Sequence, residues 1–309
     1  MKKIISLSLI ALAAIIVTSC SDESSLSDPF KEQSRQPFFP KNLSFRSTNN
    51  NGTVTEDSWV FEYNSDNTVK RYTCIHKITG NNLDIEERRI GDLRYYNDYT
   101  GSKCIEAKVY VDYSSRKLAE MLTYTDTITE DVVFSGNYIS SINTKGWRTT
   151  SGDRVSTLSS KQTFNYTNDL CTGSTFIDNN NEKSYTYSWK NNMLVNVVVH
   201  NQNKKNSDLT HDTYEYSYNN KIFATNYVFN PLAFIYNNKP LIYDAMGYMG
   251  KSTPYLLELE KYDGYENING KKYDIQSEQH SYHIMSGTNS LIYSAESPGY
   301  SEYIYNFSE

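Results

Sequence analysis

Alternating apolar and polar residues constrain the fold of this chain more than any other feature. In residues 107–113 and 185–189, every second residue is apolar or aromatic and most residues between them are polar. Similar runs occur at residues 59–63, 195–199 and 213–218. A period of two over about five to seven residues is typical of a β-strand that buries one face. The pattern therefore predicts strands along most of the chain.

Polar turns separate these runs. An aromatic residue ends one run, a few polar residues rich in Asn and Asp follow, and an aliphatic residue starts the next, at 63–69, 113–118, 166–170, 189–194 and 218–222. Asn and Asp tolerate left-handed backbone, which hairpin turns require. A lone hairpin cannot bury its apolar face, so successive hairpins must pack together. The sequence predicts an all-β fold, a long antiparallel meander of hairpin repeats forming a curved sheet or open barrel.

One segment departs from the strand pattern. Leu241, Ala245, Tyr248 and Met249 are spaced as on one face of a helix. This spacing predicts one short helix near residues 241–250, placed to cap the open end of the curved sheet.

Composition narrows the classes of partner. Aromatic residues make up 14% of the chain, including 28 Tyr, which a disordered chain would lack. The formal net charge is -6, whereas a nucleic-acid-binding protein needs a basic face to displace counterions from phosphates. We therefore expect a folded domain that does not bind nucleic acid.

The N-terminus is a targeting signal. Lys2 and Lys3 precede an apolar run at residues 4–17, which is too short for a membrane-spanning helix. The run ends in Val17-Thr18-Ser19-Cys20, which resembles a bacterial lipoprotein signal. The resemblance implies cleavage before Cys20 and acylation of Cys20. The alternative is an ordinary secretory signal that has Cys20 near its cleavage site by chance.

An acidic segment follows Cys20. Residues 21–25 read Ser-Asp-Glu-Ser-Ser, which resembles the export signal of Bacteroidetes surface lipoproteins and implies a position on the outer membrane, at the cell surface. The alternative is a generic acidic linker. We divide the chain into a signal peptide at 1–19, an acidic flexible tether at 20–40 and a single β-rich repeat domain at 41–309.

The strand-and-turn unit resembles a known type of repeat. A Tyr-x-Tyr strand, a polar turn and an aliphatic restart are similar to degenerate YD repeats of the RHS type. Together with the lipoprotein start and the segment at 247–256, the chain resembles Bacteroidetes lipoproteins with a porin-like domain of unknown function. The resemblance covers about residues 40–309 and implies an antiparallel meander that curls into an open or closed barrel. It implies no activity.

The candidate site residues are few. The alternating aromatic residues form a candidate binding platform, although they would equally serve as the core of the sheet; the set is Tyr185, Tyr187, Trp189, Tyr214, Tyr216 and Tyr218. Asp126-Thr127-Ile128 resembles the O-glycosylation site of Bacteroidetes secreted proteins, which would place a glycan on Thr127 in a surface turn. Cys74, Cys104 and Cys171 have no zinc-binding spacing, and their pairing stays open.

Catalytic signatures are absent from the sequence. It has no serine-hydrolase elbow, and His280 and His283 would point to opposite faces of a strand. We therefore expect no catalytic residue, metal or cofactor, but a non-enzymatic surface binding or scaffold domain with a glycan or protein partner. The alternative is a periplasm-facing carrier of lipid or another apolar ligand in a half-barrel cavity.

Overall fold

The computed structural model describes residues 41–48, 52–80, 82–117, 120–205, 208–222, 243, 247–250, 255–286, 290–296 and 300–308. Every regular element within these residues is a β-strand, which confirms the predicted all-β class. The strands are β1 (Asn42–Thr48), β2 (Val54–Tyr63), β3 (Val69–Gly80), β4 (Leu83–Asn97), β5 (Lys103–Lys117), β6 (Glu120–Ser135), β7 (Tyr138–Thr150), β8 (Asp153–Thr167), β9 (Leu170–Asp178), β10 (Asn181–Lys190), β11 (Met193–Asn203), β12 (Leu209–Ile222), β13 (Tyr255–Ile268), β14 (Lys271–Ser286), β15 (Ser290–Glu296) and β16 (Tyr300–Ser308). In this part of the chain no helix has the length and apolar character needed to cross a membrane.

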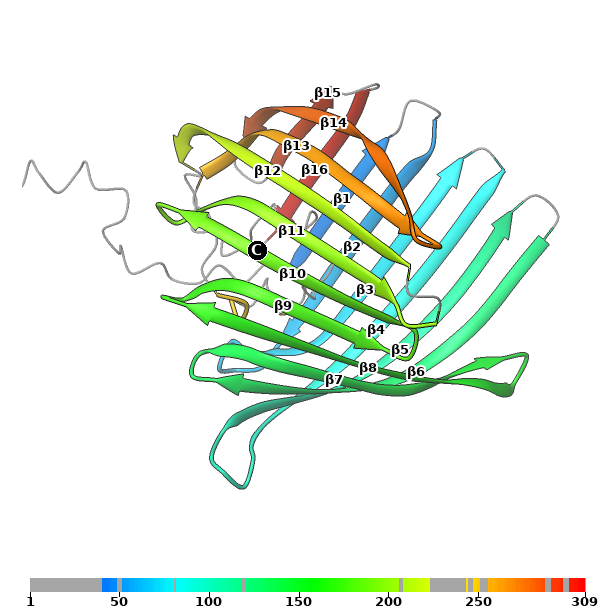
Figure 1. Ribbon diagram of the computed structural model, residues 1–309. Helices are drawn as coiled ribbons and strands as arrows, with labels where there is room; N and C mark the ends of the chain where they lie inside the picture. The colour runs from blue at the N-terminus through cyan, green and yellow to red at the C-terminus, as the bar shows by residue number, and fades with distance from the viewer. Residues whose placement is uncertain are drawn as a thin grey trace, which may run out of the picture. The chain divides into compact units, whose positions relative to one another are not determined.

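The strands form one antiparallel meander. Each strand pairs with the next along the chain, so the colours in Figure 1 change gradually from one strand to its neighbour. The first strand also pairs with the last, with Asn42 opposite Ser308 and Thr48 opposite Glu302. This seam between β1 and β16 joins the two ends of the curved sheet into a barrel. It also pairs N–H and C=O groups that a free sheet edge would offer to other chains.

Asparagine-rich hairpins join the strands where three of the predicted turns lie. Between β8 and β9, Asn168 and Asp169 have φ of 52° and 66°. Between β10 and β11, Asn191 and Asn192 have φ of 52° and 58°. Two consecutive left-handed residues are typical of a type I′ turn, whose twist matches the strands that it joins. The local sequence therefore determines these hairpins.

Two other predicted turns are wrong. Residues 113–117 continue β5, where Ser114 pairs with Glu86 of β4. Residues 218–222 continue β12, where Ile222 pairs with Tyr255 of β13. The Ser-Ser-Arg-Lys segment after Tyr113 contains no Asn or Gly to adopt left-handed backbone, so pairing with β4 extends the strand.

The two faces of the sheet differ in polarity. Fully buried residues of β5 alternate with exposed Lys108 and Tyr110; the buried set is Ile105, Ala107 and Val109. We call the buried side of the sheet the inner face and the exposed side the outer face. Outer-face side chains include the ion pair between Arg71 and Asp92, with Nε and Oδ1 2.7 Å apart.

The predicted helix near 241–250 is not found as an element of the described residues. Tyr243 alone has helical backbone, and residues 247–249 form a turn. Gly247 and Gly250 have positive φ of 74° and 88°, a conformation that ends a helix rather than continuing it. The other positions of this prediction lie outside the described residues.

The segment nevertheless contacts one end of the barrel, beside the β6–β7 hairpin. The Tyr243 hydroxyl is fully buried and donates a hydrogen bond to Glu130 Oε2, 2.9 Å away. The Ile139 N–H donates to the Tyr248 carbonyl at 2.9 Å, and the Tyr248 ring packs edge-on against Phe134. Desolvation raises the pKa of Glu130, and the hydrogen bond from Tyr243 opposes this effect by stabilising the carboxylate. These contacts place a cap over the inner face.

The three cysteines of the β-domain are free thiols, which answers the question of pairing that the sequence left open. Cys74, Cys104 and Cys171 are all buried. Burial raises the pKa of Cys74 to about 12, which suppresses the reactive thiolate. The cysteines therefore act as small apolar side chains in the core.

Candidate binding face on strands β4 to β7

The aromatic set predicted from the sequence lies on the inner face. Tyr185, Tyr187 and Tyr216 are buried, and Trp189, Tyr214 and Tyr218 are half-buried. Strand β11 separates the two groups of rings, with Val197 opposite both Tyr187 and Tyr214. Trp189 Nε1 donates to the carbonyl of Cys171 at 2.7 Å. Trp189 is thus less buried than expected, but its polar tip is satisfied.

Burial favours a core role for this set. Desolvation raises the pKa of Tyr185 and of Tyr214 to about 12. The Tyr218 hydroxyl donates to the Leu194 carbonyl at 2.6 Å. Because these side chains are occupied with internal contacts, little ring surface is left for a ligand. Their use as a binding platform stays a prediction.

A different pair of aromatic residues is exposed on the outer face. Tyr110 of β5 is 52% exposed and Trp147 of β7 is 38% exposed. Tyr110 lies opposite Thr127 of β6, and Thr127 lies opposite Trp147. We call Tyr110, Thr127 and Trp147 the aromatic row. Its outer members are two strand spacings apart, about 10 Å.

Sequence reasoning missed this pair. In the alternation at residues 107–113, Tyr110 falls among the residues between the apolar positions, on the side expected to be polar. An aromatic residue on the polar side of an alternating strand was the available signal, because a Tyr ring there offers an apolar face and a polar tip to solvent.

Local packing fixes the aromatic row. A Cβ at Gly146 would collide with the carbonyl oxygen of Thr127, so only glycine allows β6 and β7 to approach this closely. The guanidinium of Arg154 lies 4.4 Å from the centre of the Trp147 ring. This cation–π contact holds the indole in one orientation on the outer face.

The predicted O-glycosylation site lies within the same row, and not in the expected surface turn. Thr127 is in the middle of β6 and is half-buried. Asp126 before it faces inward, is 6% exposed and accepts hydrogen bonds from Arg148 Nε and Nη2 at 2.8 and 2.9 Å. An enzyme that attaches a glycan to Thr127 would therefore need to act before β6 pairs with its neighbouring strands. Glycosylation of Thr127 itself stays a prediction.

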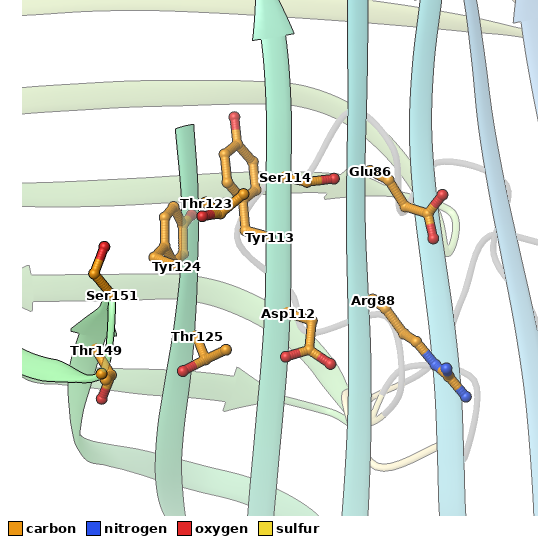
Figure 2. A pocket seen from close by; sticks show the side chains of 11 residues that line it. Glu86, Arg88, Asp112, Tyr113, Ser114, Thr123, Tyr124, Thr125, Thr149 and Ser151 are labelled. Atoms are coloured by element: carbon orange, nitrogen blue, oxygen red, sulfur yellow. The ribbon is translucent and has the colours of Figure 1, made fainter. Parts of the chain in front are cut away.

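Two rows of polar side chains continue the outer face beside the aromatic row. Their members lie opposite one another across β4–β7: Arg88, Asp112, Thr125 and Thr149 in one, and Glu86, Ser114 and Thr123 in the other. Figure 2 shows these side chains at two successive levels of the strands. Together with the turn after β7, they line a groove of about 540 Å³.

The groove combines hydrogen-bonding groups with fixed backbone. Tyr113 and Tyr124 also border it, but they share the inner face with Val111 and Asp126, and their rings stack with centroids 4.5 Å apart. Arg148, also on the inner face, lies 3.4 Å from the centre of the Tyr124 ring. The exposed side chains of Arg88 and Asp112 add one charge of each sign. The groove therefore offers donors and acceptors without a strong net charge.

The groove is better arranged for binding than for hydrolysis. Glycoside hydrolysis needs two carboxyl groups, one of which has its pKa raised by an apolar environment. Glu86 is instead paired with Lys77, with Oε2 and Nζ 3.1 Å apart, and Asp112 is exposed. Within the described ranges, no group of three or more His, Cys, Asp or Glu is placed to hold a metal ion.

The fold belongs to the class of all-β antiparallel meanders, and solved structures of this class resemble it. A porin-like protein from Bacteroides vulgatus ATCC 8482 aligns with a TM-score of 0.50 and 10% identity, over 87% of this chain and 97% of that chain. A porin-like protein from Bacteroides uniformis ATCC 8492 aligns with a TM-score of 0.47 and 13% identity, over 87% of this chain and 96% of that chain. The first likeness supports the porin-like fold that the sequence predicted. No family profile and no curated protein matches the chain.

Proposed function

We propose that this chain is a non-enzymatic lipoprotein, anchored through Cys20, that binds glycan on the outer face of β4–β7. The observation that carries the proposal is the aromatic row of Tyr110, Thr127 and Trp147 lying directly beside the polar groove. The predicted glycan or protein partner is thereby narrowed to a glycan.

The chemistry of a sugar fits this arrangement. A pyranose ring has an apolar C–H face and a rim of hydroxyl groups. The exposed surface of Tyr110 and the part of the Trp147 ring that Arg154 does not cover can receive the C–H face. Arg88, Asp112 and Thr125 in the next row supply donors and acceptors for the hydroxyl rim. The spacing of the two rings matches that of alternate sugars in an extended chain.

Removing either exposed ring should weaken binding. We expect Trp147→Ala and Tyr110→Ala each to raise the Kd for a bound oligosaccharide by about tenfold or more, corresponding to about 1.4 kcal/mol. Isothermal titration of the full chain with the oligosaccharide selected on a glycan array would measure this. Tyr273→Ala is the matched control, since Tyr273 is equally exposed at 52% but lies on β14.

The opposite results are equally clear. Unchanged affinity in both aromatic variants, or an equal loss of affinity in the Tyr273 control, would show that the glycan does not bind on β4–β7. Turnover of the oligosaccharide would contradict the non-enzymatic part of the proposal. A glycan attached at Thr127 would occupy the row, so binding should be measured on chain of known mass.

The anchor is tested separately. Replacing Cys20 with Ala should release the protein from the membrane fraction, because acyl chains supply the binding energy of about 0.8 kcal/mol per buried CH₂. Thiol titration of the denatured mature chain should find three reactive cysteines if Cys20 is acylated, since the sequence has four. Four reactive thiols, or membrane retention of the signal-cleaved variant, would refute the anchor. Protease added to intact cells should degrade a surface protein and spare a periplasmic one.

A carrier of lipid or another apolar ligand remains the second candidate. Its support is the apolar inner face, capped by the contact between Tyr243 and Glu130. Inner-face residues such as Val109 and Val132 are already fully buried, so a ligand would have to displace existing contacts. Native mass spectrometry that detects co-purified lipid would favour the carrier, and its absence would favour the outer-face proposal.

A further inference from the structure

Two histidines lie opposite each other on the outer face, away from the aromatic row. His200 of β11 pairs in register with His211 of β12. Their Nδ1 atoms are 3.1 Å apart, and their ring centroids are 4.5 Å apart. His200 is exposed and His211 is half-buried, so solvent reaches the pair. We propose that His200 and His211 form a binding site for a divalent transition-metal ion, with Cu²⁺ favoured.

The separation of the two nitrogen atoms suits one shared ion. Metal–imidazole bonds are about 2.0–2.1 Å long, so nitrogens 3.1 Å apart subtend about 100° at the metal. This angle lies between the square-planar and tetrahedral values that Cu²⁺ and Zn²⁺ adopt. Rotation of the rings about their Cβ–Cγ bonds turns both lone pairs toward the ion. Ligation through both Nδ1 atoms requires both neutral imidazoles to carry their proton on Nε2, so the Nδ1 proton of the hydrogen-bonded pair moves to Nε2 of its own ring and no net proton is released.

Neighbouring groups support ligation. His211 Nε2 is 3.3 Å from Thr213 Oγ1, an outer partner that orients the ring. The ring of Tyr265 stacks on His211 with centroids 4.9 Å apart. The antiparallel pairing of β11 with β12 thus holds both ligands in place before an ion arrives.

The ionisable groups around the pair include charges of both signs. Lys272 lies 4.6 Å from the Tyr265 ring centre and forms an ion pair with Asp274 at 2.8 Å. Asp212 and Asp263 place negative charge near His211, and Lys272 places positive charge near it. With two protein ligands, the remaining positions on the ion are left to water or to a ligand from solution. Imidazole ligands should give the order Cu²⁺ above Ni²⁺ and Zn²⁺, with negligible binding of oxygen-preferring Mg²⁺.

Titration of the full chain, purified without a polyhistidine tag, with CuCl₂ tests the site. We expect His200→Asn and His211→Asn each to weaken the tightest Cu²⁺ site by at least the ~10–100-fold that loss of an outer partner costs. Electron paramagnetic resonance of the wild-type complex should show two nitrogen ligands, and one in each variant. Gln202→Ala, an exposed change on the same face of β11, should leave the affinity unchanged.

The proposal fails if the tightest site survives either histidine substitution, or if Gln202→Ala weakens it equally. Retention of two nitrogen ligands in both variants would assign the ion to other histidines of the chain. A further measurement separates ligation from folding: urea unfolding without metal should give similar midpoints for wild type and both variants, because His200 is exposed and His211 is only half-buried.

Discussion

Replacing Asp126 with Ala should lower the free energy of unfolding by about 3 kcal/mol. Asp126 is 6% exposed on the inner face, and both of its oxygens accept hydrogen bonds from Arg148. The substitution leaves the guanidinium without its carboxylate, and a partly buried unpaired charge is costly. Urea unfolding of the full chain, followed by tryptophan fluorescence, measures the loss.

The outer face supplies a matched control. Arg71 and Asp92 make the same two-bond contact, at 2.7 and 2.9 Å, but both side chains are nearly half exposed. Asp92→Ala should therefore cost less than about 1 kcal/mol. Combining Asp126→Leu with Arg148→Met should recover most of the loss, since no unpaired charge remains. Equal losses of unfolding free energy in Asp126→Ala and Asp92→Ala would show that burial does not determine how much an ion pair contributes to stability.

Glu260→Gln should instead stabilise the protein at alkaline pH. Glu260 is 8% exposed, its Oε2 has no hydrogen-bond partner, and desolvation raises its pKa to about 7. Above that pH the folded protein must bury an unpaired carboxylate. The shift from a reference pKa of 4.5 corresponds to about 3 kcal/mol, which the neutral amide avoids.

The pH dependence has a definite sign. Because the folded-state pKa is the higher one, the folded protein binds the additional proton between about pH 4.5 and 7. Wild-type stability should therefore fall as pH rises through this range, relative to Glu260→Gln. The stabilities of the wild type and Glu260→Gln should be similar near pH 4 and differ most at pH 8. Urea unfolding midpoints measured at both pH values would show this. Exposed Glu258→Gln is the control, and a difference independent of pH would refute the assignment.

Much of the fold could be predicted from the sequence because its causes are local. Alternation of side chains along β5 and β10 arises from the strand period of two, and it identifies strands without knowledge of their neighbours. The turns at Asn168-Asp169 and Asn191-Asn192 depend on the preference of those residues for left-handed backbone. The extension of β5 to Lys117 could not be predicted, because it depends on pairing with β4.

Most residues of the candidate site could not be predicted from the sequence. The regular pattern of the Tyr-x-Tyr strands led to their prediction as a binding platform. The structure places their rings on the inner face. Tyr110 and Trp147 are separated by 36 intervening residues, yet strand register places both beside Thr127. His200 and His211 become neighbours in the same way. Register between strands thus brought together the residues of both candidate sites on the outer face.

The sequence by itself determined the strands and several hairpins, because side-chain periodicity and turn preferences are properties of the chain alone. Only the tertiary structure decided which aromatic residues are buried, how β1 meets β16 and which residues lie side by side. The physical reason is that burial and register are set by contacts between distant segments. A shift of one residue would turn every side chain of a strand to the other face.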